Sequence, residues 1–283
     1  MTRLARSIRM TPGAGAALIA ALAVAVVAMA APAAAKTGAE VPAEPRVQAA
    51  APSAAQPGTW DRGARSFQIT PYAWAAGLGG DLTVGAQTVR IDKSFSELLS
   101  DLDGAFFVSG FARQGRLVFL GDLSRSSSSR GGTLPAPAPG VPAEGRLRQL
   151  SATLAAGYRV ADTPRASLDL LGGLRHWRLR ASAQVPALGF AATRRASFTD
   201  PIIAARLNAR LAPGWSGLVY ADIGGFGVGS EFTGQIVATV NYAATDRLFL
   251  SAGYRHLHVD YRGGGLRADM RMSGPLLGAT WRF

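Results

Sequence analysis

The chain has 283 residues, contains no cysteine and carries a formal charge of +12 at neutral pH. The absence of cysteine excludes a disulfide framework and a thiolate metal site, and three histidines (His176, His256 and His258) leave little material for a histidine-rich metal centre. The excess of basic residues admits two kinds of anionic partner, nucleic acid and the phosphates of a membrane surface.

Residues 1–35 have the three-part layout of a secretory signal peptide. Arg3, Arg6 and Arg9 give a positive start, an alanine-rich apolar stretch follows, and residues 33–35 (AAA) offer a small-residue cleavage site. An uncleaved membrane anchor is the alternative. Because an exported chain does not normally meet DNA, the sequence predicts no nucleic-acid partner.

Residues 36–65 are rich in Ala, Pro and Gln, lack periodicity, and predict a flexible periplasmic lead. From residue 66 to the end, segments alternate apolar and polar residues, and most reach the ~9–11 residues that a tilted strand needs to cross a bilayer. No later stretch has the ~18 consecutive apolar residues of a transmembrane helix. The strand candidates are about 66–78, 105–113, 116–126, 146–160, 165–180, 200–212, 215–226, 232–243, 247–261 and 266–283.

The connections between these segments alternate in length. Turn signals at 114–115, 162–164, 213–214 and 245–246 alternate with long links at 79–104, 127–145 and 181–199, then shorter links near 227–231 and 262–265. Short turns at one end and long loops at the other are typical of bacterial outer-membrane barrels. We therefore expect an all-β fold over residues 66–283, a closed antiparallel transmembrane β-barrel of about ten strands (eight to twelve possible). In the first long link, residues 94–103 (SFSELLSDLD) predict a short amphipathic helix that could cap or plug the barrel.

Alternation alone does not say which face of the strands is inside, because soluble barrels also alternate. Here the polar face is crowded with Gly, Ala and Ser, as suits the inner wall of a small barrel. The apolar face carries aromatic residues near strand ends, which matches interfacial girdles. The sequence therefore predicts that the apolar face meets lipid. The aromatic residues are Tyr158, Trp215, Tyr242, Trp281 and Phe283.

Several segments between residues 66 and 283 have a recognisable pattern, among them ITPYAWAAGLGGDLTVG, LDLLGGLRHWRL, DPIIAARL, GYRHLHVDY and GPLLGATWRF. On these segments, residues 66–283 resemble a family of proteobacterial outer-membrane β-barrel proteins without an assigned activity. The resemblance implies a barrel fold and a Gram-negative outer-membrane location, and it supplies no catalytic residues. The carboxyl-terminal residues Trp281 and Phe283 resemble the signal that the barrel-assembly machinery reads.

Several charged residues fall on the expected inner face, in neighbouring or opposing strands. A buried charge must be paired or hydrated, since an isolated one costs several kcal/mol. These residues therefore predict either an ionic network that fills a narrow lumen or the selectivity filter of a narrow channel for small solutes. A ten-stranded barrel is close to the size that side chains can fill, which favours the network. The residues are Asp122, Asp169, Arg175, Arg206, Asp222 and Arg255.

The region near 125–195 is rich in arginine. Arginine binds phosphate bidentately, so these residues predict contacts with lipopolysaccharide, with ordinary solvated loop charge as the alternative. The residues are Arg125, Arg146, Arg148, Arg178, Arg180, Arg194 and Arg195.

A hydrolase at the barrel rim is a third hypothesis. His256, His258 and Asp260 share one strand face, and Asp101 and Asp103 lie in a segment expected near the same rim. General-base chemistry needs the histidine within hydrogen-bond reach of its partners. Because strand alternation makes such spacings common, we expect no enzymatic activity.

The sequence thus predicts an integral outer-membrane barrel with a structural or surface-interaction role. It implies no cofactor and no metal, and it leaves the oligomeric state open. The expected partners are outer-membrane lipid, lipopolysaccharide and the barrel-assembly machinery.

Overall fold

A computed structural model describes residues 65–84, 87–93, 102–133 and 140–283 of the protein. The predicted signal peptide and nearly all of the predicted lead lie outside these residues, because the first strand begins at Arg65. The described strands are β1 (Arg65–Trp74), β2 (Gly77–Val84), β3 (Gln87–Lys93), β4 (Leu102–Gln114), β5 (Leu117–Thr133), β6 (Pro142–Asp162), β7 (Ala166–Val185), β8 (Phe190–Ala212), β9 (Trp215–Gly225), β10 (Phe232–Ala243), β11 (Leu248–Gly263) and β12 (Leu266–Arg282), with one short 3-10 turn, η2 (Pro186–Leu188).

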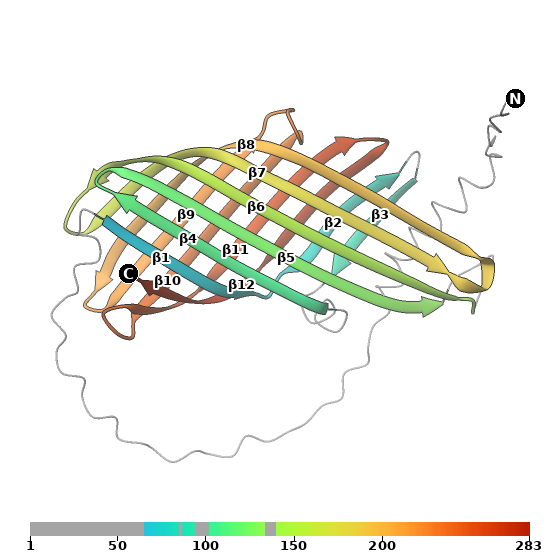
Figure 1. The fold of residues 1–283 in the computed structure, drawn as a ribbon, viewed down its shortest axis with the longest axis horizontal. Helices are drawn as coiled ribbons and strands as arrows, with labels where there is room; N and C mark the ends of the chain where they lie inside the picture. The colour runs from blue at the N-terminus through green and yellow to red at the C-terminus, as the bar shows by residue number, and fades with distance from the viewer. Residues whose placement is uncertain (1–64, 85–86, 94–101, 134–139) are drawn as a thin grey trace, which may run out of the picture.

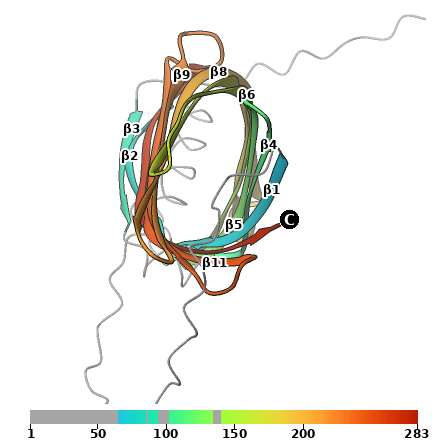
Figure 2. The same ribbon diagram turned by 90° about the vertical axis from the view of Figure 1, so that its left-hand side faces the viewer.

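The strands form a closed antiparallel barrel. Sheet order runs β1-β4-β5-β6-β7-β8-β9-β10-β11-β12, and β12 pairs back with β1 from Gln68↔Arg282 to Trp74↔Leu276. Figure 2 looks along the barrel and shows these strands as a ring. The predicted ten-stranded closed barrel is confirmed. Its short turns identify the periplasmic end, and the opposite end is called extracellular below.

A β-hairpin, β2–β3, extends the wall at the extracellular end. The outer half of β12 pairs with β2 from Ser273↔Gly77 to Leu266↔Val84, and β3 pairs with β2 (Figure 1). At Gly80, a Cβ atom would lie 2.0 Å from the carbonyl oxygen of Asp269, so only glycine allows this close approach.

The hairpin corrects one prediction. The prediction of one long link over residues 79–104 is wrong for the parts that form β2, β3 and the start of β4. The glycine-rich β2 sequence GLGGDLTV has no strong alternation that could have revealed a strand. The predicted helix at 94–103 lies outside the described residues, except for residues 102 and 103, which belong to β4.

The periplasmic two thirds of the wall have the predicted orientation. Leu154 on β6, Leu170 on β7 and Ile236 on β10 point outward and are 73%, 48% and 49% exposed. Arg175 and Arg255 point inward and are 0% and 2% exposed. An apolar outer surface over a closed sheet suits a hydrocarbon solvent, because closure gives each strand of the ring a hydrogen-bonded neighbour on both sides.

The extracellular ends of β5–β8 reverse this pattern. On β7, Ala183 and Val185 point inward and are buried, whereas Arg178 and Arg180 point outward and are exposed. The apolar side faces the interior here because the outer surface has left the lipid and meets water. The long links predicted at 127–145 and 181–199 are therefore wrong for residues 127–133, 142–145, 181–185 and 190–199, which belong to β5–β8.

Candidate functional site

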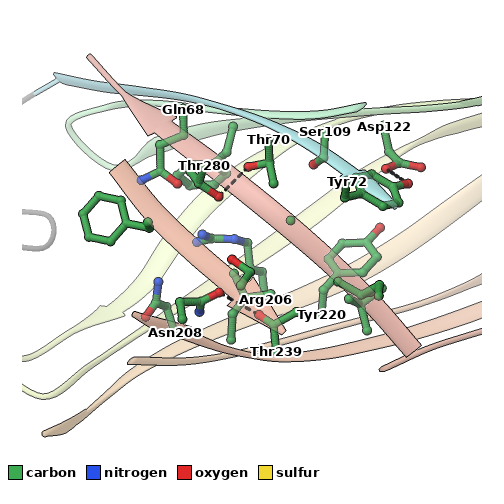
Figure 3. Close-up of a pocket in the computed structure, with 18 of the residues that line it drawn as sticks. Gln68, Thr70, Tyr72, Ser109, Asp122, Arg206, Asn208, Tyr220, Thr239 and Thr280 are labelled. Atoms are coloured by element: carbon green, nitrogen blue, oxygen red, sulfur yellow. Dashed lines mark hydrogen bonds between the residues drawn. The ribbon is translucent and has the colours of Figure 1, made fainter. Parts of the chain in front are cut away.

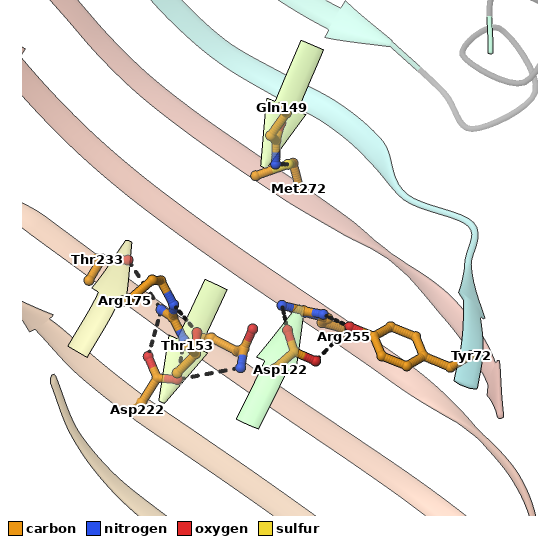
Figure 4. Close-up of polar contacts among 10 residues, drawn as sticks. Tyr72, Asp122, Gln149, Thr153, Arg175, Asp222, Thr233, Arg255 and Met272 are labelled. Carbon is orange, nitrogen blue, oxygen red and sulfur yellow. Dashed lines mark hydrogen bonds and ion pairs between the residues drawn. The ribbon is translucent and has the colours of Figure 1, made fainter. Parts of the chain in front are cut away.

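A buried bidentate ion pair projects into the lumen from one side of the barrel. Arg175 on β7 donates from Nη1 to Oδ1 of Asp222 on β9 at 2.9 Å, and from Nη2 to Oδ2 at 2.5 Å. Thr153 accepts from Arg175 Nε at 3.1 Å, and Thr233 accepts from Nη1 at 3.2 Å (Figure 4). Strand alternation turns all four side chains inward from four different strands. The guanidinium and carboxylate are therefore both fully buried and neutralise each other.

A second ionic cluster lies nearer the periplasmic end. Asp169 on β7 accepts from Arg159 Nε at 2.8 Å and from Arg206 Nη1 at 3.1 Å. The Arg206 guanidinium also lies 3.9 Å from the centroid of the Phe111 ring, a cation–π contact. Arg159 was not among the predicted network residues. Its position could have shown its role, since it shares the inward face of β6 with Thr153.

The third cluster joins opposite walls of the barrel. Arg255 on β11 lies 3.3 Å from the carboxylate of Asp122 on β5, and Tyr72 on β1 donates its hydroxyl to the same carboxylate at 2.8 Å. Arg255 also donates to the Tyr72 hydroxyl (Figure 4) and lies 4.6 Å from the Trp74 ring centroid. The structure thus brings all six predicted inner charges into three buried clusters.

An apolar layer fills the lumen on the extracellular side of these ion pairs. Trp177 and Phe198 are stacked with centroids 6.3 Å apart, and Phe198 stacks on Tyr261 from the opposite wall at 4.4 Å. Leu257 and Met272 are buried in the same cluster. This layer was not predicted, because the inward positions were expected to be polar along the whole barrel.

Six of the seven predicted phosphate-binding arginines lie on the outward face, just beyond the lipid-facing leucines. Each one is exposed. The register places Arg148, Arg180 and Arg195 directly opposite one another on β6, β7 and β8. Arg194 points to the other face of β8, because it neighbours Arg195 in a strand. We call the six residues Arg125, Arg146, Arg148, Arg178, Arg180 and Arg195 the arginine belt.

Three arginines of the belt line a surface hollow of about 230 Å³. Arg146, Arg148 and Arg180 line it together with Ser182, Gln184 and Thr193, which offer further hydrogen-bonding groups. Among the described residues, no carboxylate lies within ion-pair distance of a belt arginine.

Two carboxylates lie at the edge of the belt, Glu144 beside Arg146 on β6 and Asp103 on β4. Asp103 accepts hydrogen bonds from Ser129 at 2.5 Å and Ser127 at 3.1 Å. These bonds, with the Ser129 bond the stronger cause, and the positive charges of Arg146 and Arg148 lower the pKa of Asp103 below its ordinary value. Asp103 therefore stays ionised at neutral pH and offsets part of the positive charge of the belt.

The residues of the hydrolase hypothesis point outward rather than into a cleft. His258 Nε2 lies 2.9 Å from Asp269, His256 Nδ1 lies 2.5 Å from Ser273, and Asp260 pairs with Arg262 at 3.3 Å. Asp103 is held on β4–β5, and Asp101 lies outside the described residues. In the part of the chain that the structure describes, no group of three acidic or histidine side chains could hold a metal ion.

A search of protein-family models and of curated proteins finds no match to this sequence. Solved structures with the same fold include Ail, the attachment invasion locus protein of Yersinia pestis, in complex with the heparin analogue sucrose octasulfate (13% identity, TM-score 0.36, 77% of this chain and 98% of that chain). They also include the outer membrane protease OmpT of Escherichia coli (10%, 0.44, 77% and 97%) and the translocator domain of the autotransporter NalP from Neisseria meningitidis (13%, 0.45, 80% and 91%). At this identity the likeness assigns no activity to the chain.

The location of the protein follows from its own surface. An outward apolar band on a closed antiparallel barrel, with short turns at one end and long strands at the other, is the construction of bacterial outer-membrane barrels. Trp215 and Tyr242 contact each other at the periplasmic edge of the band, with centroids 4.9 Å apart, as an interfacial girdle requires. The protein is an integral β-barrel of the bacterial outer membrane.

Proposed function

We propose that the protein is a non-conducting outer-membrane barrel that binds the phosphates of lipopolysaccharide through its arginine belt. The observation that carries the proposal is the row Arg148, Arg180 and Arg195 on three adjacent strands. This role is a surface interaction in the outer leaflet and needs no catalysis.

The row of like charges argues for an anionic partner. Directly opposed side chains on neighbouring strands have Cβ atoms about 5 Å apart, and like charges at this spacing are destabilising. Phosphate oxygens can accept paired N–H bonds from a guanidinium, and such bonds are stronger than those between neutral groups. A phosphate bound in the hollow beside Arg146, Arg148 and Arg180 would therefore turn mutual repulsion into attraction.

The height of the belt supports lipopolysaccharide as the source of that phosphate. Arg178 follows Leu174 on the outward face of β7, with only His176 between them. The belt thus begins where the apolar band ends, at the level where lipid headgroups meet the hydrocarbon. Soluble anions would need no such alignment with the lipid-facing leucines.

The filled lumen supports a non-conducting role rather than a channel. A permeating solute would have to separate the Arg175–Asp222 pair and then displace Trp177 and Phe198. Breaking one buried pair costs about 3–5 kcal/mol, before any cost of moving the aromatic layer. Purified barrel in a planar bilayer is therefore expected to show no steady conductance, and a stable open current would overturn this part of the proposal.

Charge removal at matched positions tests the lipopolysaccharide site. The variant Arg148→Gln/Arg180→Gln/Arg195→Gln should bind immobilised lipopolysaccharide at least about tenfold more weakly than the unaltered barrel. The control, Arg116→Gln/Arg165→Gln/Arg247→Gln, removes the same charge from exposed periplasmic turns and should bind normally. Equal losses in both variants, or no loss in the first, would overturn the proposal. Dephosphorylated lipopolysaccharide should reproduce the effect of the belt variant.

A further inference from the structure

The periplasmic half of the lumen holds a cavity of about 170 Å³, shown in Figure 3. The Tyr72–Asp122–Arg255 cluster and Arg206 lie at its inner end. Asn208 and Asn241 line its sides close to the periplasmic turns. The cavity is therefore a dead-end pocket, since the ion pairs and the aromatic layer close it toward the extracellular side.

The cavity exists because small side chains occupy the inward positions there. Ser216, Ser251 and Gly278 face the lumen in the periplasmic half, whereas Trp177 and Phe198 fill it in the extracellular half. The same ring of strands forms both halves, so the available width is similar. Protein interiors are normally packed to the density of organic crystals, which makes the unfilled half a specific property of this sequence.

The lining combines neutral polar groups with aromatic and aliphatic surface. Thr70, Thr239 and Thr280 contribute hydroxyls, and the Gln68, Asn208 and Asn241 side chains contribute amides, while Phe111 and Phe249 contribute ring faces. Hydroxyls and amides both donate and accept hydrogen bonds, so each can pair with another hydroxyl in either sense. Small-molecule sites are usually built from apolar walls and a few convergent polar groups.

Three buried polar atoms of the lining have no hydrogen-bond partner: the Tyr220 hydroxyl, Arg255 Nε and Gln235 Oε1. Gln235 is 8% exposed, and its Nε2 donates to Asp222 at 3.4 Å, but its Oε1 makes no hydrogen bond. A buried acceptor left unsatisfied costs about 1–3 kcal/mol. A hydroxyl group in the cavity would satisfy it.

Charge at the cavity favours an acidic ligand. Of the three arginines in its lining, Arg206 pairs with Asp169 and Arg255 pairs with Asp122, and Arg282 adds a further positive charge. Arg282 lies near the periplasmic mouth, where its guanidinium stacks on Phe249 with a centroid distance of 5.8 Å. An anion arriving from the periplasm would therefore be attracted at the entrance.

We propose that this cavity is a binding site for a small polyhydroxylated solute that enters from the periplasm, with an acidic monosaccharide preferred over a neutral one. The hydroxyl and amide groups hold the sugar hydroxyls, the aromatic rings pack on the C–H face of the sugar ring, and Arg282 attracts the carboxylate. The site lies on the inner face and is independent of the arginine belt.

Calorimetric titration of the detergent-purified barrel with D-glucuronate, D-glucose and cyclohexanecarboxylate tests the proposal. We expect glucuronate to bind most tightly, glucose at least several-fold more weakly, and cyclohexanecarboxylate, which lacks hydroxyls, not to bind. Equal binding of glucuronate and cyclohexanecarboxylate would overturn hydroxyl recognition, and the absence of sugar binding would overturn the site.

A matched pair of variants locates the binding. Ser251 points into the cavity and Ala252, the next residue, points to lipid, so Ser251→Phe should abolish glucuronate binding while Ala252→Phe leaves it unchanged. The isosteric Thr239→Val keeps the shape of the cavity and should weaken binding about tenfold if the hydroxyl contributes a hydrogen bond of ~1.4 kcal/mol. Retention of glucuronate binding by both Ser251→Phe and Thr239→Val would place the sugar elsewhere and overturn the proposal.

Discussion

Arg175 and Asp222 form a two-point ion pair inside the barrel, with both side chains completely removed from solvent. The pair joins β7 to β9 past the intervening β8, so it ties together strands that are not hydrogen-bonded neighbours. Such a pair does not by itself make a protein more stable, because burying two charges costs nearly as much as their attraction returns.

Removing one partner should therefore be far more damaging than removing both. We expect Asp222→Ala to lower the free energy of unfolding by about 3–5 kcal/mol, because it leaves the Arg175 charge buried and unpaired. The double variant Arg175→Met/Asp222→Leu should recover most of that loss. Urea unfolding of the barrel in lipid vesicles measures both, and a double variant as unstable as the single one would contradict the argument.

A charged residue on the lipid-facing band should destabilise the barrel by an amount that depends on its depth in the bilayer. Leu154→Arg places a guanidinium among the outward leucines and should cost about 2–4 kcal/mol in vesicles. Thr193→Arg, on the same outward face but level with the belt, should cost close to nothing. If the two substitutions had equal effects in the same unfolding measurement, the assignment of the hydrocarbon boundary would be wrong.

The aromatic layer and the ionic layer should act as two barriers in series. Trp177→Ala is expected to destabilise the barrel by about 3–5 kcal/mol. A planar bilayer containing this variant should still show no conductance, because Arg175 and Asp222 still occupy the lumen. Adding Arg175→Ala and Asp222→Ala should produce conductance. Currents from Trp177→Ala alone would show that the ion pairs do not block the path.

The carboxyl-terminal residue should matter more for assembly than for stability. Phe283 packs on Phe67 with centroids 5.5 Å apart and donates its backbone N–H to the Phe67 carbonyl at 2.9 Å, yet its side chain is 70% exposed. Phe283→Ala should therefore slow appearance of the heat-modifiable barrel in cells, while barrel refolded from urea into detergent should reach nearly normal stability. Equal impairment in both settings would argue against a signal role.

The barrel and its membrane-facing surface could be predicted from alternation alone, because hydrocarbon and a narrow lumen impose opposite demands on the two faces of each strand. The inward charged residues could be predicted from the same alternation, and the structure adds which carboxylate pairs with which guanidinium. That pairing depends on strand stagger, which the sequence does not show directly. Asp169, for example, pairs with Arg159 and Arg206 rather than with Arg175 on its own strand.

The extracellular half was predicted less well for a physical reason. Above the belt the outward residues are polar and the inward ones are Ala, Leu and Val, so the rule that apolar means outward no longer holds. The segment 181–199 still alternates, but its apolar residues point inward and its polar residues point outward. A loop was therefore predicted there. Trp177 and Phe198 lie at this change of phase, which is why the aromatic layer was missed.

The seventeen residues of β12 pair with β1 toward the periplasmic end and with β2 toward the extracellular end. Their partners emerge from the ribosome some two hundred residues earlier (the β1 register pairs Gln68 with Arg282). A chain released before β12 would leave the edges of β1, β2 and β11 unpaired, open to proteases and to pairing with other chains. A chain without β12 should thus fail to close, and its open strand edges would expose it to degradation in the periplasm.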